Sequence, residues 1–532
     1  MLKPSLIAKT NAKANESQIK IINNVRITYL TSRLIRVEVD KFYDDASFTV
    51  FNRKFENVEK FKVTKSGKKI FVETKDAVFT IKNNKPLCVK IKSSGKVQYF
   101  KKQKNLKGTR RTLDATFGKV ELNDGLITKD GAYLLDDSNS SLLDESGHFV
   151  PRDGGKDYYC FAYGNDYRQT VKAFLSISGS TPLVPRFALG VWWSRYHAYT
   201  DGEYLSLMDR FERENVPLTV ATVDMDWHYV DLDKQFGIKE NGWTGYSWNK
   251  ELFKDYKNFL ANLQGRNLKV TLNLHPADGI RFFEDMYEDT AKAVGIDPES
   301  REPVKFSCKS DDFWNAYFDK VHKPYEKDGV DFWWIDWQQG KKSDIKGLDP
   351  LNALNHYHFL DNAENGQLPL ILSRYAGLGS HRYPLGFSGD TAINFKVLDF
   401  QPYFTVNAAN AAYFWWSHDI GGHHLGYRND ELYLRWIQFG VFSPILRLHS
   451  TSNDLLGKEP WKYRQDICEN AKEWLRFRHS LIPYLFTADY ICHKNGTALC
   501  EPMYYSYPEC DDAFNVPNEY KFGDELIVCP IT

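Results

Sequence analysis

The sequence lacks the features that would place the protein in a membrane or on a nucleic acid. No apolar run reaches about 18 residues, so no transmembrane helix is predicted, and residues 1–20 lack the apolar stretch of a signal peptide. Lys plus Arg and Asp plus Glu both number 69, so the formal net charge is +0 and no basic face for nucleic acid is predicted. We therefore expect a cytoplasmic protein that binds neither membranes nor nucleic acids.

Paired cysteines and metal-binding motifs are also missing. The eight cysteines are scattered and none forms a Cys-x-x-Cys pair, so we interpret them as free, mostly buried thiols in a reducing compartment. His418, His423 and His424 lie close together in the chain, but no His-Glu-x-x-His or comparable frame surrounds them. We therefore expect neither a metal site nor a cofactor, and the sequence carries no signal of an oligomeric state.

The sequence does contain enough apolar and aromatic material for a large folded protein. Its 532 residues suggest about three domains, or one large domain with additions, and 42% of the residues are hydrophobic. Aromatic residues reach 15%, and such rings can stack on flat apolar ligand faces as well as pack in a core. The chain therefore has a sizeable core and side chains suited to binding ring-shaped ligands.

Residues 1–184 show the pattern of a β-sandwich. Short alternating runs such as "RLIRVEV" (33–39) and "KIFVET" (69–74) lie between clusters of Asn, Gly, Ser and Lys. The stretch 147–164 is rich in glycine and aromatic residues. We expect this stretch to form a long loop that reaches a neighbouring site.

The pattern changes at about residue 185, where apolar runs of strand length begin to alternate with amphipathic helical stretches such as 249–265 and 310–329. Continuous apolar strands separated by helices are typical of a parallel sheet that is buried on both faces. Residues 185–490 therefore predict an α/β fold, a (β/α)8 TIM barrel. The eight runs are 187–193, 218–227, 269–276, 330–337, 369–375, 385–391, 413–422 and 441–449.

The end of the chain looks like the start of a third unit. Residues 491–532 include "NEYKFGDELIVCPIT" (518–532), which has the composition of further β-structure. We expect this unit to be the start of a C-terminal β-sandwich that stops abruptly, so that the chain is a fragment or the unit is very short.

Polar side chains close most of the eight apolar runs. The carboxyl ends of barrel strands carry the active site in enzymes of this fold. One Asp after a strand is often only a helix cap, but a set that converges on one rim predicts a functional site. The ionisable residues at these ends are Asp224, Asp226, His275, Asp336, Arg374, Asp390, Asp419 and His449.

Two carboxyl groups that face each other across a cleft can divide the roles of nucleophile and general acid. The two carboxyls lie about 5–5.5 Å apart in retaining glycosidases and about 6.5–9.5 Å apart in inverting ones. Burial raises the pKa of the acid, while hydrogen bonds keep the nucleophile ionised. Arg374 and His449 could bind sugar hydroxyls, and the surrounding aromatic rings could stack on sugar faces.

Five motifs, in order, resemble those of glycoside hydrolase family 31. The segment "WWIDW" (333–337) is similar to the nucleophile signature of the family, and "SRYAGLGSHRYPLGFSGDT" (373–391) is similar to its acid/base motif, with the spacing kept. The other three are "VDMDWH" (223–228), "HDIGGH" (418–423) and "FSPILRLH" (442–449).

The resemblance implies a retaining exo-α-glycosidase that acts by double displacement without a metal, most simply an α-glucosidase. Asp336 would be the nucleophile and Asp390 the acid/base. Trp334 would line the pocket for the terminal sugar. The substrate of the enzyme would be an oligosaccharide or another glycoside. The residues implied to bind that sugar are Asp224, Arg374, Asp419 and His449.

The chain departs from the family pattern on the predicted pocket wall, and there we expect the substrate to be decided. Trp337, Gln338 and Gln339 stand where α-glucosidases of the family have Met-Asn-Glu, while Phe387 and His423 replace a Trp and a Phe. We therefore expect all but His423 of these to take part in substrate binding. The glycone stays open among α-glucoside, α-xyloside, α-galactoside and α-N-acetylgalactosaminide, and a transglycosylase or a non-catalytic carbohydrate-binding homologue remains an alternative.

Overall fold

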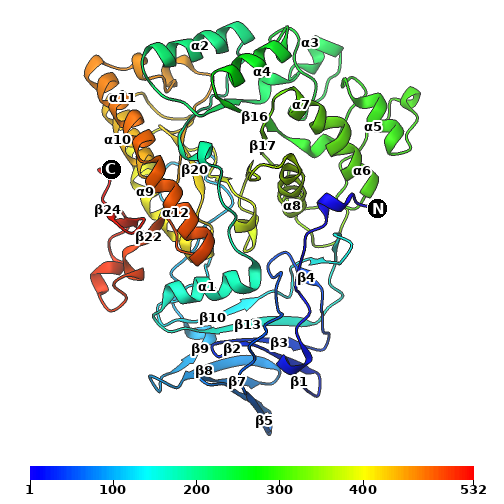
Figure 1. The fold of residues 1–532 in the computed structure, drawn as a ribbon, viewed down its shortest axis with the longest axis vertical. Coiled ribbons are helices and arrows are strands. Elements are labelled where there is room, and N and C mark those ends of the chain that lie inside the picture. Colours follow the sequence, from blue (N-terminus) through cyan, green and yellow to red (C-terminus); the bar gives the residue numbers. More distant parts are fainter.

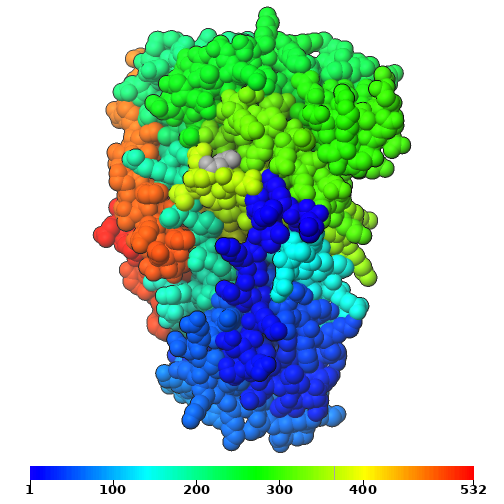
Figure 2. Space-filling view, turned by 45° about the vertical axis from the view of Figure 1, so that its right-hand side comes forward, coloured from blue at the N-terminus to red at the C-terminus, as the bar shows by residue number. Residues whose placement is uncertain are grey.

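The computed structural model describes residues 1–364 and 366–532 and has the predicted α/β architecture. A β-rich N-terminal part lies at the bottom of Figure 1, the barrel with its helices lies above it, and a small C-terminal sheet lies at the side. The chain begins beside the barrel, and its first residues then run over the surface down to the N-terminal sheets (Figure 2). Within the described ranges, no helix is long and apolar enough to cross a membrane.

Two antiparallel sheets form the predicted N-terminal β-sandwich. The first has the strand order β1 (Ile19–Ile22), β2 (Val25–Thr31), β3 (Leu34–Val39), β13 (Lys156–Ala162), β10 (Ala132–Asp136). The second consists of β5 (Lys62–Ser66), β6 (Lys69–Glu73), β7 (Ala77–Lys82), β8 (Lys85–Ile91) and β9 (Val97–Tyr99). Alternate residues of both sheets, such as Ile27 and Val37 opposite Val72 and Phe79, bury one apolar layer between them.

The prediction of a long loop at 147–164 is wrong, because half of this stretch forms strands. It contributes β13 to the sandwich and β12 (Phe149–Val150) to a small sheet with β4 (Ala46–Ser47) and β11 (Leu142–Leu143). The segment that reaches the carboxyl ends of the barrel strands is instead residues 103–131, which we call the N-terminal loop. The backbone N–H of Leu113 in this loop donates to the carbonyl of Ser388, 2.7 Å away.

The barrel prediction is confirmed, since each of the eight apolar runs contains one strand of a parallel sheet. A bridge between Ser373 and Gly386 joins β18 to β19 and closes the circle. The strands are β14 (Val191–Trp193), β15 (Val220–Val223), β16 (Lys269–Leu274), β17 (Phe332–Ile335), β18 (Ile371–Leu372), β19 (Gly386–Phe387), β20 (Trp416–Ile420) and β21 (Ile445–Leu448).

Helices surround the barrel, and α1 lies between it and the sandwich (Figure 1). Their bounds are α1 (Tyr167–Ser178), α2 (Asp201–Arg213), α3 (Leu232–Phe236), α4 (Tyr256–Gly265), α5 (Tyr287–Ala293), α6 (Asp311–Ala316), α7 (Lys323–Asp328), α8 (Pro350–Asn362), α9 (Phe395–Asn407), α10 (Asp430–Val441), α11 (Gln465–Ser480) and α12 (Ile482–Asn495). The sequence pattern did not predict α1, which lies in the part interpreted as β.

The two helices predicted from amphipathic patterns are present with altered limits. The first begins only at Tyr256, because the side chain of Asp255 accepts from the N–H of Asn258 and caps α4 there. The second is split into α6 and α7 by a π-helical turn, Tyr317–His322. Pro324 lies two residues after the end of this turn and has no N–H for the α-helical hydrogen bond.

A small antiparallel sheet follows α12. It consists of β22 (Cys500–Pro502), β23 (Tyr520–Phe522) and β24 (Leu526–Val528). The hydroxyl of Tyr520 donates to the carbonyl of Phe442, 2.8 Å away, and the ring of Phe522 lies 5.7 Å from that of Phe442. These contacts fix the sheet to the barrel, while the predicted domain limits at residues 184 and 490 stay predictions.

Arg478 on α11 holds together the end of the barrel opposite to the strand ends predicted to carry the site. Its side chain is fully buried and donates to the carbonyls of Leu189, Val441, Ser443 and Pro444 at 2.7–2.8 Å. These carbonyls lie just before β14 and β21. One guanidinium therefore pairs four backbone acceptors that no water can reach.

We predict that Arg478→Leu destabilises the protein strongly, because Leu keeps much of the apolar volume but leaves four buried carbonyls without donors. Unfolding free energy should fall by about 3 kcal/mol or more. The melting temperature, followed by circular dichroism, should fall by several degrees. Arg476→Leu is the matched control, since Arg476 lies on the same helix and makes one exposed bond to the carbonyl of Asn215. Equal melting temperatures for the two variants would contradict the prediction.

Candidate active site

Three neighbouring strands bring polar groups together around Asp336, which directly follows β17. The backbone N–H of Asp336 donates to the carbonyl of Leu274, 2.8 Å away, and this extends the pairing of β17 with β16 by one residue. Arg374, after β18, donates from Nε to Asp336 Oδ1 at 2.9 Å. His275, after β16, places Nε2 at 3.5 Å from Asp336 Oδ2. Adjacent parallel strands thus surround one buried carboxylate.

The surroundings of Asp336 favour its ionised form. Burial by itself would raise the pKa of this carboxyl, but the Arg374 guanidinium and His275 outweigh it and hold the pKa well below the usual range. Gln338 Nε2 also lies 3.2 and 3.3 Å from the two carboxylate oxygens. One of the two predicted glutamines therefore contacts the carboxylate itself, while the exposed Gln339 only accepts from the N–H of Gln338.

Asp390, which follows β19, is in the opposite state. Burial raises the pKa of its carboxyl well above the usual range, and the negative charges of Asp419, Asp114 and Asp336 raise it further, while Arg374 opposes them. Asp390 is therefore protonated at a pH where Asp336 is ionised. Such a pair of carboxyls can act as a nucleophile and a proton donor.

Asp114 is a site residue that the sequence reasoning missed. It lies in the N-terminal loop, and its Oδ1 accepts from the backbone N–H of Asp390 at 2.8 Å. Its carboxylate also lies 3.0 Å from Arg374 Nη1, which donates to Thr112 Oγ1 at 2.6 Å. No strand-end or helical pattern distinguishes "RTLDATFG" (111–118) in the sequence. The site is therefore completed by a segment outside the barrel.

Gly389 is required where the N-terminal loop meets the barrel. Its backbone has a φ of +97°, which glycine adopts without strain. A Cβ at this position would lie 2.0 Å from Asp114 Oδ1 and 2.9 Å from Arg374 Nη1. Any larger residue would push Asp114 away from Asp390.

Four further strands contribute a second group of polar side chains. Arg447 on β21 donates from Nη2 to Asp419 Oδ1 at 2.6 Å, yet burial still raises the pKa of Asp419 to about 6. Ser194 Oγ lies 2.7 Å from His449 Nδ1, and Asp224 Oδ2 lies 4.0 Å from Nε2 of the same ring. Burial also raises the pKa of Asp224, to about 7. These side chains lie at the ends of β14, β15, β20 and β21.

Aromatic rings form one wall beside these charges. Trp334 is 2% exposed, and its ring meets the edges of Phe387 at 5.3 Å and His449 at 5.5 Å. The Arg374 guanidinium lies over Phe387, 4.4 Å from the ring centre. Trp337 faces elsewhere: its ring packs against Phe306 at 5.2 Å, and its Nε1 donates to the carbonyl of Gly340 at 2.7 Å. Substrate binding by Trp337 stays a prediction.

Several buried polar atoms of this group have no hydrogen-bond partner within the described part of the chain. They are His275 Nδ1, Trp334 Nε1, Arg374 Nη2, Asp419 Oδ2 and His423 Nδ1. Leaving such an atom unpaired costs about 1–3 kcal/mol. A bound molecule with many hydroxyl groups would supply both donors and acceptors to this set.

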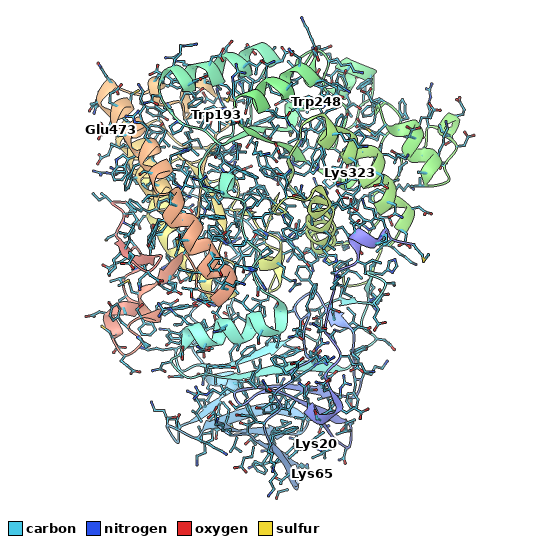
Figure 3. The ribbon with its side chains drawn as sticks, in the orientation of Figure 1. Lys20, Lys65, Trp193, Trp248, Lys323 and Glu473 are labelled. Atoms are coloured by element: carbon cyan, nitrogen blue, oxygen red, sulfur yellow. The ribbon has the colours of Figure 1, made fainter. Side chains whose placement is uncertain are left out.

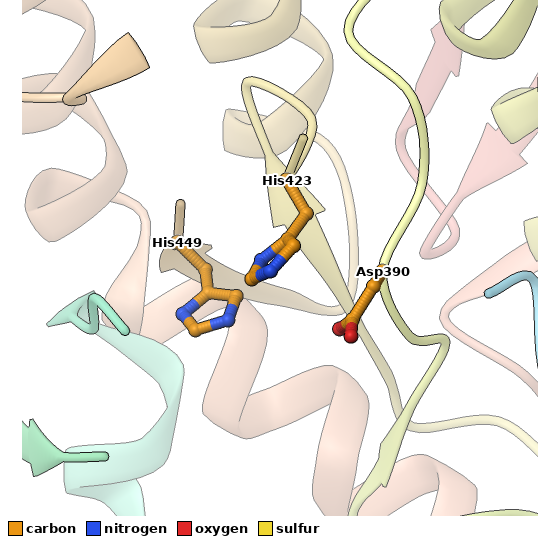
Figure 4. A group of neighbouring side chains, drawn as sticks. All are labelled: Asp390, His423 and His449. Atoms are coloured by element: carbon orange, nitrogen blue, oxygen red, sulfur yellow. The ribbon is translucent and has the colours of Figure 1, made fainter. Parts of the chain in front are cut away.

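Three of the site residues could also hold a metal ion. Asp390, His423 and His449 each bring one ligand atom within 4.8 Å of the others, and the two imidazole rings stack at 4.8 Å (Figure 4). Burial lowers the pKa of His423 to about 3, so its ring is neutral, as a metal ligand must be. A cation here would displace the proton of Asp390. His418 is not available, because its two ring nitrogens lie 3.0 Å from Ser388 Oγ and 2.8 Å from Thr405 Oγ1.

Comparison with known sequences identifies the barrel. A family model described as "Glycosyl hydrolases family 31 TIM-barrel domain" matches residues 181–488. The chain is 24% identical to an α-xylosidase of Saccharolobus solfataricus over 406 residues, which cover 71% of this chain and 52% of that protein. It is also 24% identical to α-glucosidase 2 of Bacillus thermoamyloliquefaciens over 421 residues, 72% of this chain and 51% of that protein. The chain thus spans about half the length of the curated relatives it matches.

Solved structures share the fold over nearly the whole chain. A glycoside hydrolase family 31 dextranase of Flavobacterium johnsoniae complexed with glucose superposes with a TM-score of 0.76 at 17% identity and covers 98% of this chain and 75% of that one. A family 31 α-xylosidase from a soil metagenome, complexed with xylose, gives a TM-score of 0.72 at 16% identity. The match covers 96% of this chain and 90% of that one. Both likenesses include the N-terminal part as well as the barrel.

We predict that Gly389→Ala detaches the N-terminal loop, because the new methyl group overlaps Asp114. The variant should melt earlier and should be cut by trypsin after Arg110 or Arg111 faster than the wild type. Gly377→Ala is the matched control: Gly377 has a φ of +114° but no atom within 4 Å of its would-be Cβ. In both variants the alanine has a positive φ, which lowers the free energy of unfolding by about 1 kcal/mol. Equal trypsin sensitivity in the two variants would refute the overlap argument.

Proposed function

The chain belongs to glycosyl hydrolase family 31, and from this we propose that it is a retaining exo-α-glycosidase that removes a terminal α-linked sugar. Asp336 attacks the anomeric carbon while Asp390 protonates the leaving oxygen, which gives a glycosyl ester of Asp336 and the free leaving alcohol. Asp390 then takes a proton from water, the water oxygen bonds to the anomeric carbon, and the ester bond to Asp336 breaks. Each carboxyl ends the cycle in its starting state.

The observation that carries this proposal is the opposite surroundings of the two carboxyls, which shift their pKa values in opposite directions. Arg374 and His275 hold Asp336 ionised, whereas burial among other carboxylates keeps Asp390 protonated. Asp336 is therefore ionised and Asp390 protonated at the start of the first step, as a nucleophile and a proton donor must be. A binding protein that does not turn over its sugar has no need of this arrangement, so we favour catalysis over the non-catalytic alternative.

The buried unpaired atoms favour a sugar as the ligand. Arg374 Nη2 and Trp334 Nε1 are donors, and Asp419 Oδ2 is an acceptor, so hydroxyl groups can satisfy all three. Trp334 and Phe387 close the pocket with apolar faces, which suits a single terminal ring held at the base of the site. We assign Asp224, Arg374, Asp419 and His449 to this ring.

The glycone stays open within the family. Relatives named α-xylosidase and α-glucosidase support xylose or glucose, and glucose is the simplest assignment. Phe387 lies in the aromatic wall and Gln338 lies beside Asp336. At these two positions the site would distinguish a galactose or N-acetylgalactosamine ring from glucose or xylose. Transfer to a sugar acceptor instead of water would use the same first step. That the substrate is met in the cytoplasm stays a prediction from the sequence.

The direct test is hydrolysis of p-nitrophenyl α-glycosides of glucose, xylose, galactose and N-acetylgalactosamine. We expect one of them to be cleaved with the α-anomer as the first product by NMR, and Asp336→Asn to lower kcat by roughly 10⁴-fold. Asp344→Asn, in the same loop but bonded to Ser307 and Cys308, should stay active. An active Asp336→Asn variant, a β-anomer, or no cleavage of any glycoside would refute the proposal, while longer saccharides at high substrate concentration would indicate transfer.

The pH dependence follows from the two carboxyls. Asp390 must be protonated, so kcat/KM should fall as the pH rises through its elevated pKa. The Asp114 charge helps to raise this pKa, so removing the charge should lower it. In Asp114→Asn the alkaline limb of kcat/KM should therefore move to lower pH. An unchanged limb, or a move to higher pH, would show that another group limits the reaction on that side.

A further inference from the structure

A cavity of about 500 Å³ lies beside the candidate site, between the N-terminal loop and the loop that follows β17. Thr112 forms part of its wall, and the same Thr112 hydroxyl accepts from Arg374. Lys341 closes it from the other side and belongs to the loop that carries Asp336 and Gln338. The cavity therefore adjoins the groups that surround the reacting bond.

The lining of this cavity is cationic, although the chain as a whole carries a formal net charge of +0. Four basic side chains face two acidic ones there. They are Lys107, Arg110, Arg111 and Lys341, against Glu121 and Asp124. A local excess of positive charge in a neutral protein favours an anionic ligand at this place.

Two of the basic side chains are already paired. Lys107 Nζ lies 2.7 Å from Asp124 and 3.8 Å from Glu121, which accounts for both carboxylates of the cavity. Arg111 pairs with Asp349, next to the start of α8, and so ties the N-terminal loop to the barrel. These ion pairs fix the walls and together carry a net charge of −1, so the positive charge that a ligand meets comes from the remaining two basic side chains.

The other two, Arg110 and Lys341, have no ion pair among the described residues. Arg110 Nη1 makes only a long contact, 3.4 Å, to the backbone carbonyl of Glu121. Its remaining guanidinium donors and the Lys341 ammonium are available to a ligand. A planar guanidinium and a mobile ammonium suit a tetrahedral oxyanion, which can accept from both.

We propose that this cavity is a subsite for a sulfate or phosphate ester on the leaving-group side of the substrate. The proposal rests on the proposed function, which places the terminal sugar against Trp334 and Phe387. Only the part of the substrate beyond the scissile bond would then extend to the cavity. The oxyanion accepts from Arg110 and Lys341, and Thr112 adjoins it. The preferred substrate is then a glycoside with an anionic leaving group, such as a sulfated or phosphorylated saccharide.

The kinetic test compares two glycosides of the same sugar, one of 4-methylumbelliferone and one of 8-hydroxypyrene-1,3,6-trisulfonate. The measured quantity is the ratio of kcat/KM for the anionic over the neutral substrate, in wild type, Arg110→Gln and Lys341→Gln. Comparing the ratio between variants cancels the reactivity of the two leaving groups. We expect the ratio to fall about three- to fivefold in each variant, as for a partly exposed charge pair, and to fall in wild type as salt is added.

Lys65→Gln is the matched control, because Lys65 lies at the far end of the sandwich, away from the barrel (Figure 3). It should keep the wild-type ratio. If wild type cleaves the neutral glycoside but Arg110→Gln and Lys341→Gln leave the ratio unchanged, the subsite is refuted and the proposed function stands. If the ratio falls equally in Lys65→Gln, the effect is general electrostatics, and the subsite is also refuted.

A binding measurement decides the subsite even if no glycoside is cleaved. The free dye 8-hydroxypyrene-1,3,6-trisulfonate is titrated with the protein and followed by fluorescence anisotropy. We expect a dissociation constant that rises at least about threefold in Arg110→Gln and in Lys341→Gln but not in Lys65→Gln. Competition by inorganic sulfate or by inorganic phosphate then identifies the preferred ester. A dissociation constant for the dye that is unchanged in both Arg110→Gln and Lys341→Gln would overturn the proposal.

Discussion

The buried pairing of Arg374 with Asp336 and Asp114 is the interaction on which the rest of the site depends. The guanidinium is 1% exposed and touches a carboxylate of the barrel and a carboxylate of the N-terminal loop at 2.9 and 3.0 Å. Without it, Asp336 and Asp114 would be two like charges with no arginine between them, and burial would favour the protonated form of Asp336. One cation therefore joins two parts of the chain and keeps one carboxylate ionised.

The carboxyls of the site differ because fixed cations reach only some of them. Asp336 has Arg374 and His275, and the pKa of its carboxyl lies below the usual range. Asp419 has Arg447, which only partly offsets burial, so its pKa is raised to about 6. Asp390 has no hydrogen-bonded cation among the described residues, and its pKa is raised most clearly by burial and its acidic neighbours. Chemically identical groups thus acquire different protonation states from the positions of two arginines.

The barrel and most strand-end residues could be predicted because their signals are local. An apolar run of strand length, closed by a polar residue, predicts both a buried parallel strand and the direction of its last side chain. Asp114 and its contact with Asp390 could not be predicted in this way, since the contact depends on the path of a loop from another part of the chain. The same limit explains the wrong loop at 147–164, where glycine and aromatic content gave no information about pairing with β3. Gln338 stands out in the sequence, but its contact with Asp336 depends on the path of the loop that follows β17.

The insertion of the N-terminal loop also bears on how such proteins are recombined. A barrel is commonly treated as a module that carries its whole chemistry on its own rim. Here the absence of a side chain at Gly389 leaves room for Asp114. Thr112 accepts a hydrogen bond from Arg374, and Asp114 forms an ion pair with it. The N-terminal loop is therefore part of the candidate site, and the loop and the barrel have to be inherited together. A chimera that joins this barrel to a foreign N-terminal domain would keep every barrel strand and the pair of Arg374 with Asp336, but Arg374 would lose Thr112 and Asp114.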